Sequence, residues 1–488
     1  MRRGTRKLLA LLLVIVSGVY FLAHTGRVQA PSFIDTEKTQ KYAAQFVSPK
    51  AFSSSEDSRL GNKAFVTIVT NTGDMEKRLS VHIARTFGWF PNNAVYSDED
   101  AVVLGYPVTN IMRYLPEESF SLPGLKNFLV RHRAISEQWS WEGVPIIVDA
   151  ENANESYNHF KIIPALAHSW VTDKYRNWYV LLTDETFILP ATLATIVEGK
   201  DPEEVHYLGR THRDSEYAFG GAGIVLSRGA MKKLFGDTNL EANNAIKESV
   251  KVAAETDNGD KVLYEMLKKA AGTTIGRELQ SNVYTGIFQG TSVNKFFSSF
   301  DHWCETVGTF YKSDPLEYDM LADWYNSLKS EKGSNYRPTY YDFYERFTMP
   351  LVAIERPDWI LETDNEADTH FISFEESSEK DCINECRSLT NCYQWSFTEN
   401  KGCTLFKNVL SRGKAYNDHW EGYQPEHASI CGYMYDRIDI GRKEGKYSCD
   451  NPESEEGTLV RQLSFGRFPL DLQDFDGSTY DNVFNMDM

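Results

Sequence analysis

The sequence lacks the excess of basic residues that nucleic-acid binding requires. Its 488 residues include 51 Lys and Arg against 69 Asp and Glu, for a formal net charge of −18. Because nucleic-acid binding depends on cationic side chains that neutralise phosphates, this balance argues against such a partner. The chain also lacks a Gly-x-Ser-x-Gly motif, which argues against a serine hydrolase of that type. Aromatic residues at 13% and hydrophobic residues at 41% are sufficient for a packed core.

Cysteine is scarce in most of the chain, and the first 381 residues contain only Cys304. Four cysteines then fall within 22 residues, and these are Cys382, Cys386, Cys392 and Cys403. In an oxidising compartment, this density predicts a small module held together by disulfides. A zinc site is the alternative, although zinc sites usually show two close Cys pairs. Cys431 and Cys449 bring the total to an odd number, so one thiol has no assigned fate.

The N-terminus carries four basic residues before an apolar run at residues 8–23. This run is short for a span of about 20 residues, which suits a thin early-secretory bilayer. We favour a signal anchor with residues 1–7 in the cytosol and the remainder in the lumen, as in a type II protein of the Golgi or ER. A cleaved signal is the alternative, because small residues occur at 28–30. Asn154 begins an Asn-Glu-Ser sequon and is a predicted glycosylation site.

The next segments predict an α/β domain. Residues 24–60 are polar and indicate a stem, and 65–69 form an apolar, β-prone run. A four-residue apolar period then predicts one helix, with Met75, Leu79, Ile83 and Phe87 along its stripe. A second strand at 94–96 gives the strand–helix–strand opening of a parallel sheet. We predict an α/β domain over 61–345, a linker over 346–369, a disulfide-rich module over 370–440 and an acidic tail over 441–488.

Two further segments suggest where chemistry occurs. The apolar run Trp178-Tyr-Val-Leu-Leu-Thr ends in Asp184 and Glu185, and a buried strand of this kind delivers its acids to the carboxyl edge of a sheet. Carboxylates there can hold a divalent cation against phosphates. The alternative is a solvated acidic turn or a helix cap. Phe219-Gly-Gly-Ala-Gly-Ile-Val-Leu-Ser227 is a Gly-rich turn entering a strand, where backbone can approach a substrate.

Three further motifs accompany these two segments. Asn158-His-Phe-Lys-Ile-Ile-Pro164 precedes the acidic strand end, and the Gly-Gly-Ala-Gly turn is followed by Asp257-Asn-Gly-Asp-Lys-Val-Leu263 and Trp303-Cys-Glu-Thr-Val-Gly-Thr-Phe310. This succession resembles the Fringe and core-1 β-1,3-galactosyltransferase family of glycosyltransferases, fungal branch, over roughly residues 61 to 325. The resemblance implies a GT-A-type, Rossmann-like nucleotide-sugar domain. It also implies inverting transfer of galactose or a related sugar from a UDP-sugar, in β-1,3 linkage, to a glycan or glycoprotein.

The resemblance also implies roles for individual residues. Asp260 precedes a Val-Leu helix, as the catalytic base does in relatives, although an acid there can also serve only as a helix cap. By the same resemblance, Thr70, Asn71 and Asp98 are expected to contact the nucleotide, and Lys161 is expected to face the diphosphate. Gly220, Gly221 and Gly223 are expected to shape the acceptor side of the site.

This chain departs from the family pattern at its cation site. The acid-x-acid triplet of the family falls on Thr183, Asp184 and Glu185, so the first acid is absent and the last is Glu. The family's His after a Thr-Phe strand is replaced by Tyr311 and Lys312. A Mn²⁺ site at Asp184 and Glu185 is therefore in doubt. Lys312 is predicted to pair with a phosphate, and an exposed Lys beside an aromatic core residue is the alternative.

The cysteine cluster is similar to an apple/PAN module, a small α+β fold. Cys-x3-Cys puts two sulfurs on one helical face, and Gln394-Trp-Ser-Phe397 is typical of a strand that follows. The resemblance implies the pairs Cys382–Cys403 and Cys386–Cys392 and a module that recognises the acceptor. The alternative function for the whole chain is a catalytically degenerate relative that binds a glycan or a protein.

Overall fold

The structure is a computed structural model that describes most of the region between Leu60 and Ile438. The described residues are 60, 63–122, 124–126, 128–129, 132, 157–211, 215–272, 287–293, 297–299, 305–352, 355–361, 369–372, 378–399, 402–407, 409–415 and 429–438. The expected anchor and stem, Asn154, Cys304, Cys449 and the tail at 441–488 lie outside these residues. Among the residues described, no helix combines the length and apolar character needed to cross a membrane.

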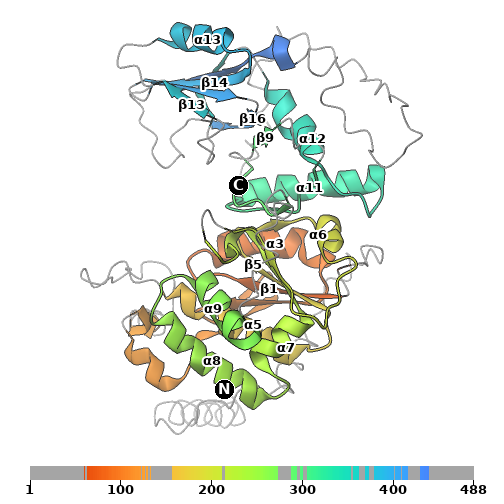
Figure 1. Ribbon diagram of the computed structural model, residues 1–488, viewed down its shortest axis with the longest axis vertical. Coiled ribbons are helices and arrows are strands. Elements are labelled where there is room, and N and C mark those ends of the chain that lie inside the picture. Colours follow the sequence, from red (N-terminus) through yellow and green to blue (C-terminus); the bar gives the residue numbers. More distant parts are fainter. Residues whose placement is uncertain are drawn as a thin grey trace, which may run out of the picture.

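A mixed seven-stranded sheet forms the centre of the larger unit (Figure 1). In spatial order its strands are β3 (Ala101–Val103), β4 (Tyr106–Asn110), β2 (Asn93–Ser97), β1 (Ala64–Val69), β5 (Trp178–Thr183), β8 (Ile224–Ser227) and β7 (Tyr207–Gly209). β4, β2, β1 and β5 run parallel, whereas the β3–β4, β5–β8 and β8–β7 pairs are antiparallel. The predicted α/β class and the parallel opening are confirmed, and the sheet as a whole is mixed.

The central strands are apolar on both faces because helices cover both sides. Along β5, Trp178, Val180 and Leu182 belong to one core cluster, and Tyr179 and Leu181 belong to the other. Successive side chains of a strand point to opposite faces, so this alternation places a hydrophobic layer on each side of the sheet. All five side chains are at most 3% exposed.

Four helices cover the face that carries Tyr179 and Leu181, in front of β1 and β5 in Figure 1. They are α5 (Ile162–Thr172), α7 (Arg228–Phe235), α8 (Asn239–Ala253) and α9 (Gly259–Ala271). α8 begins at a capping box in which Thr238 and Glu241 satisfy each other's backbone N–H groups. The helix predicted after Asp260 is thus confirmed as α9.

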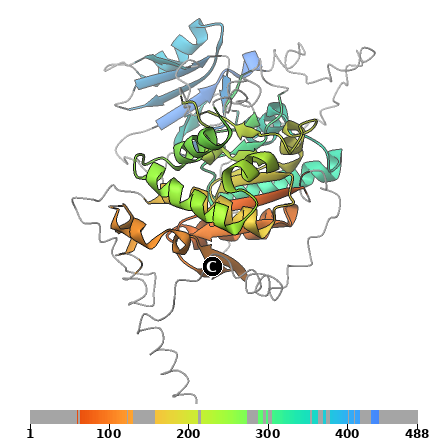
Figure 2. The same ribbon diagram turned by 60° about the horizontal axis from the view of Figure 1, so that its bottom comes forward.

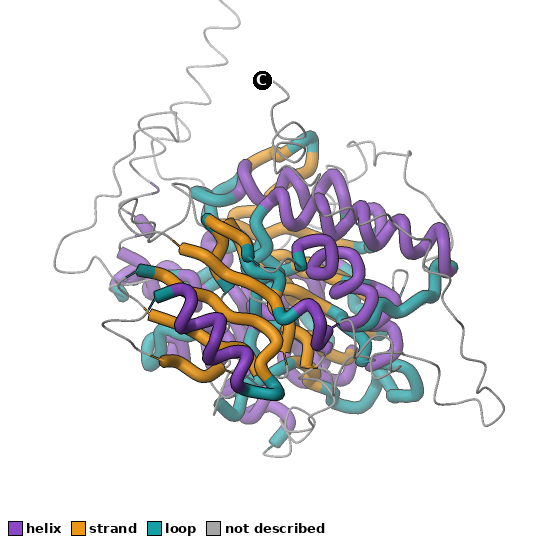
Figure 3. Tube along the Cα trace, turned by 90° about the horizontal axis from the view of Figure 1, so that it is seen from above, coloured by secondary structure: helices purple, strands orange, loops and turns teal. Residues whose placement is uncertain are grey.

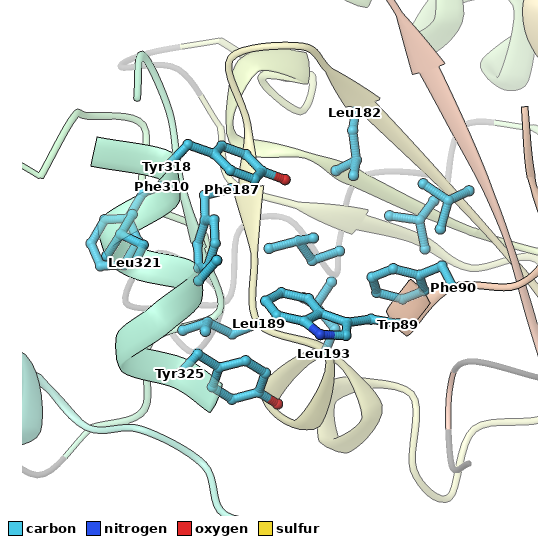
Figure 4. Close-up of a cluster of buried hydrophobic side chains, with 14 of the residues drawn as sticks. Trp89, Phe90, Leu182, Phe187, Leu189, Leu193, Phe310, Tyr318, Leu321 and Tyr325 are labelled. Atoms are coloured by element: carbon cyan, nitrogen blue, oxygen red, sulfur yellow. The ribbon is translucent and has the colours of Figure 1, made fainter. Parts of the chain in front are cut away.

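The opposite face is covered by η2 (Met75–Leu79), α3 (Ser80–Arg85), α6 (Pro190–Ile196) and α11 (Pro315–Lys332). Met75 and Leu79 of the predicted stripe are buried there, and Ile83 and Phe87 are partly buried against the same cluster. The prediction of one helix is wrong at its end, because α3 stops at Arg85 and Phe87 begins a separate 3₁₀ segment. Figure 4 shows the aromatic cluster that joins α11 to the sheet. In it the Trp89 and Tyr325 ring centroids are 5.1 Å apart, and Tyr318 packs edge-on against Phe187 at 4.9 Å.

Shorter elements complete this unit. β6 (Phe187–Ile188) and β10 (Thr309–Phe310) form an antiparallel pair beyond the end of β5. The 3₁₀ segments are η3 (Phe87–Trp89), η4 (Met112–Tyr114), η5 (Glu117–Ser121), η6 (Asn158–Phe160) and η7 (Gly220–Ala222). The β6–β10 pair carries Tyr311 and Lys312 to the same end of the sheet as Asp184 and Glu185.

The C-terminal module is a five-stranded antiparallel sheet with one helix, α13 (Glu379–Ser388). In spatial order its strands are β11 (Arg356–Pro357), β18 (Ser429–Tyr433), β14 (Cys392–Thr398), β15 (Gly402–Lys407) and β13 (Thr369–Ile372). Disulfides join Cys382 to Cys403 and Cys386 to Cys392, so both predicted pairs are confirmed. These four sulfurs are therefore not available to zinc. Cys431 is a buried free thiol.

The described part of the expected linker, residues 346–352, 355–361 and 369, includes helical segments and strands. α12 (Tyr340–Phe343), η9 (Tyr344–Thr348) and η10 (Met349–Leu351) lead to β11, and β12 (Trp359–Ile360) pairs with β17 (Lys414–Ala415). β9 (Phe297–Ser299) pairs with β16 (Val409–Ser411), so backbone hydrogen bonds connect the two units. Figure 2 shows the module in blue at one end of the molecule, and Figure 3 views it from that end.

Candidate functional site

The candidate site lies at the carboxyl edge of the parallel strands. Thr70 follows β1, Asp98 follows β2 and Asp184 follows β5, and the parallel register puts these three strand ends side by side. β8 runs antiparallel to β5 with Leu181 opposite Ile224, so the turn that precedes β8 lies at the same edge. Ligands of open α/β sheets bind outside this edge. The fold therefore brings the predicted acids and the Gly-rich turn together.

The ends of β1 and β2 are tied to each other by a buried lysine. Lys161 is fully buried, and its Nζ donates to Thr70 O at 3.2 Å and to Asn71 Oδ1 at 2.5 Å, with Asp98 Oδ1 at 3.4 Å. Asp98 also accepts from Thr72 N at 2.9 Å and from the Tyr157 hydroxyl at 2.7 Å. A buried ion pair needs such additional hydrogen bonds.

The four residues predicted to bind nucleotide or diphosphate thus form one hydrogen-bonded cluster. Lys161 meets backbone, amide and carboxylate oxygens of the protein itself, which explains why the ammonium group tolerates full burial. Its structural role is to fix the two strand ends. Contact of this cluster with nucleotide stays a prediction.

Asp184 is a buried acid, which argues against the solvated turn. Its Oδ2 accepts a hydrogen bond from the Thr70 hydroxyl at 2.6 Å, and only 6% of the surface of the residue is exposed. Burial raises the pKa of Asp184 to about 6, although the Thr70 hydrogen bond opposes this change. Asp184 O contacts His82 Nε2 at 2.9 Å, and burial lowers the pKa of His82 to about 3. The nearest following helix, α6, begins at Pro190, and its N-cap residue is Leu189 with no side-chain cap, so neither acid caps it.

Glu185 is paired with an arginine that follows β1. Arg78 Nη1 forms an ion pair with Glu185 Oε1, and Arg78 Nε lies 3.9 Å from Asp74 Oδ1. The Arg78 and Glu185 side chains keep 30% and 21% of their surface exposed, so this pair faces solvent at the site. Tyr311 lies beside Glu185. Burial and, to a smaller extent, the nearby Glu185 carboxylate raise the pKa of Tyr311 to about 12. The Tyr311 hydroxyl therefore stays protonated at physiological pH and can donate a hydrogen bond.

Asp260 lies in the first turn of α9, but it does not cap this helix. Asn258 is the cap, because its side chain accepts from the backbone N–H groups of Asp260 and Lys261. Asp260 Oδ2 instead accepts from Gly220 N at 2.7 Å. Burial raises the pKa of Asp260 to about 6, opposed by the Gly220 hydrogen bond. An acid with this pKa is ionised at neutral pH and is a stronger base than an ordinary carboxylate.

The glycines of η7 make room for protein groups of the site. A Cβ on Gly220 would overlap Asp260 Oδ1, and a Cβ on Gly221 would lie 2.7 Å from Tyr311 Cε2. Gly223 has φ +89°, a conformation that L side chains rarely adopt. The space that the missing side chains leave at Gly220 and Gly221 is thus occupied by Asp260 and Tyr311 of the protein itself. The part of these glycines in acceptor binding stays a prediction.

Tyr311 and Lys312 follow β10 and differ in their environment. The Tyr311 ring packs edge-on against Phe219, with 5.0 Å between centroids. Lys312 is exposed, has φ +56° and places Nζ 5.8 Å from the Tyr311 ring centroid. A non-glycine residue in the left-handed region is uncommon and marks a constrained turn. Ser313 N donates to Glu185 O at 3.2 Å and holds this turn against the end of β5.

The residues present at the strand end do not fit the Mn²⁺ that the family resemblance implies. One oxygen of Asp184 accepts from Thr70, and Glu185 is paired with Arg78. Tyr311 and Lys312 are not ordinary ligands for a hard cation at neutral pH. Within the described part of the chain, no three His, Cys, Asp or Glu side chains are grouped so that they could hold a metal ion.

Sequence reasoning missed Arg78, the residue that pairs with Glu185. Its signal was weak: Asp74 and Arg78 lie four residues apart next to the apolar stripe, a spacing that also occurs on ordinary exposed helices. The contact with Glu185 spans 107 residues and has no sequence pattern of its own. A comparison with models of known protein families finds no match for this chain. The chemistry of this site and the motif resemblance together are what support a function for the chain.

Proposed function

We propose that this chain is an inverting glycosyltransferase that transfers galactose or a related sugar from a UDP-sugar to a glycan or glycoprotein in β-1,3 linkage. The observation that carries this proposal is the Asp260 carboxylate. It is fixed by Gly220 N at the sheet edge, and burial raises its pKa to about 6. A carboxylate with this position and basicity suits a general base. The resemblance in motifs supplies the donor and linkage classes.

In the proposed reaction, one oxygen of Asp260 takes the proton from the acceptor hydroxyl as that oxygen attacks the anomeric carbon. The bond from this carbon to the β-phosphate oxygen breaks, and UDP leaves with the electron pair. Attack opposite to the leaving group inverts the configuration. The backbone donor Gly220 N holds the carboxylate in place during the transfer.

The test is incubation of the purified full-length chain with a panel of UDP-sugars and a glycan acceptor, followed by assay of UDP release. We expect release with one donor and loss of release in Asp260→Asn. Asp257→Asn is the matched control, because Asp257 is an exposed acid three residues earlier, just before α9. The linkage of the product is then read by NMR. No UDP release and no binding of any UDP-sugar would contradict the proposal.

The second candidate is a catalytically degenerate relative that binds a glycan or a protein. The departures from the motif pattern at Thr183, Tyr311 and Lys312 favour it. Such a protein would bind a glycan array without releasing UDP from any donor. The disulfide-linked module is present in either case. We propose an apple/PAN-like role for it in acceptor recognition.

The proposed setting is the lumen of the Golgi or ER, with a GT-A-type domain attached to the membrane by an N-terminal anchor. The two disulfides support an oxidising compartment, because such bonds persist where thiols are not kept reduced. Protease protection of the chain in sealed microsomes tests this arrangement. Complete digestion without detergent would contradict it.

A further inference from the structure

We infer that the guanidinium group of Arg78 takes the place of a divalent cation in this site. This inference rests on the proposed function, and it concerns how the charge of the departing diphosphate is offset. It follows from the poor fit of the strand-end residues to Mn²⁺. The positive group is supplied by the chain itself, from the helix that follows β1.

The position of Arg78 is fixed by two acids. η2 begins at Met75 and buries Met75 and Leu79 against the sheet, so Arg78 projects from the turn that faces the end of β5. Its Nη1 pairs with Glu185, and its Nε lies 3.9 Å from Asp74. The side chain nevertheless keeps 30% of its surface exposed. A guanidinium group has five N–H donors, so the remaining donors can meet phosphate oxygens.

Part of the acceptor capacity of the two strand-end acids is already in use. Glu185 receives Arg78 and has the Tyr311 hydroxyl as a further side-chain partner. Asp184 receives the Thr70 hydroxyl and is 6% exposed, so only a small part of it faces the site. A hard cation requires about six oxygen ligands, and it would compete with Arg78 for the Glu185 carboxylate. Arg78 in turn neutralises Glu185, which would otherwise repel a diphosphate.

Tyr311 also fits a site in which Arg78, and not a metal ion, is paired with Glu185. The family's His would offer a ring nitrogen to a metal, whereas the Tyr311 hydroxyl remains protonated and serves as a donor to Glu185. Gly221 has no side chain, and a Cβ there would collide with the Tyr311 ring. The change at position 311, the turn at Gly221 and the Arg78–Glu185 pair thus fit one another.

The test measures UDP binding to the full-length chain by calorimetry, in EDTA and in Mn²⁺. We expect the wild-type Kd to agree within about twofold between the two buffers, because Arg78 supplies the charge. Arg78→Gln should weaken binding in EDTA by about tenfold or more, since a charge-assisted contact is lost. Mn²⁺ should restore part of this loss, because Glu185 then becomes available to a cation.

Two variants keep the test decisive. Arg85→Gln is the matched control: Arg85 lies two turns further along the same helical segment and pairs with Asp319 and Asp323. It should leave UDP binding unchanged and should match Arg78→Gln in any effect on thermal unfolding. Glu185→Gln keeps Arg78 and should retain binding in EDTA. Wild-type binding that requires Mn²⁺ and is lost in Glu185→Gln overturns the inference alone. Absence of UDP binding in both buffers removes the proposed function, and this inference falls with it.

Discussion

Replacement of Asp260 by Asn should abolish transfer while making the fold more stable at neutral pH. Burial raises the pKa of the folded carboxyl from 3.8 to about 6. The ionised form is therefore less favourable in the folded state than in the unfolded state. The stability that this carboxyl contributes is fully present below about pH 4 and is lost as pH rises through 6. An uncharged Asn avoids that loss and can still accept from Gly220 N with its side-chain oxygen.

The size of the effect follows from the pKa. A shift of about two units corresponds to about 3 kcal/mol for a fully buried group. Asp260 keeps some exposure, so solvent screening should reduce the gain in unfolding free energy to about 1 kcal/mol at pH 7.5. At pH 4 the gain should vanish. Transfer, in contrast, should fall by ~10²-fold or more, since the general base is gone.

The assay is kcat/KM for sugar transfer between pH 4.5 and 8, with thermal unfolding measured over the same range. Wild-type transfer should decline below pH 6, and at pH 5 about one tenth of the sites should carry ionised Asp260. Activity loss with a stability gain separates a catalytic acid from a structural one. A variant that keeps wild-type transfer, or one that unfolds more easily at pH 7.5, would refute the reasoning.

Three further changes have defined outcomes. Asp184→Asn should raise the free energy of unfolding at pH 7.5 by up to about 3 kcal/mol and leave it unchanged near pH 4, because burial raises the pKa of this carboxyl to about 6. Equal effects at both pH values in denaturant titrations would contradict this expectation. Gly220→Ala should push the Asp260 carboxylate away and reduce the transfer rate about tenfold or more. Gly290→Ala is the control and should not reduce the rate, because a Cβ there meets Phe219 only at ordinary contact distance. Equal kinetics of the two variants would count against the importance of the Asp260–Gly220 contact. Removal of the Cys382–Cys403 disulfide by double Ser substitution should destabilise the module by about 3 kcal/mol, which would appear as earlier proteolysis of that region. Unchanged resistance of the module to protease would speak against the importance of this disulfide.

Local patterns in the sequence predicted the elements that carry the site. The apolar run before Asp184 became β5, and the helix after Asp260 became α9. The Cys-x3-Cys spacing and the resemblance to an apple/PAN module led to both disulfide pairs. These features depend on periodicity or on neighbouring residues, so they are encoded within short segments.

Strand direction and long-range pairing were not predictable in the same way. An apolar run such as Ile224–Ser227 carries no sign of direction, and β8 in fact runs antiparallel to β5. Burial of Lys161 depends on oxygens from Thr70, Asn71 and Asp98, which reach it only after the sheet has formed. The capping role went to Asn258, which competes with the adjacent acids for the same backbone donors. Such outcomes are decided by tertiary contacts.

If the proposed function holds, the contacts around Glu185 favour an altered site over a decayed one. If the cation ligands had simply been lost, Glu185 would be left as an unpaired acid beside an empty ligand position. Instead Arg78 pairs with Glu185, and Tyr311 occupies space that Gly221 leaves open. The Asp260–Gly220 contact is intact at the other side of the same turn. A protein that only binds glycans does not need a buried carboxylate whose ionisation reduces its stability, so Asp260 is the residue whose substitution best separates the two proposed functions.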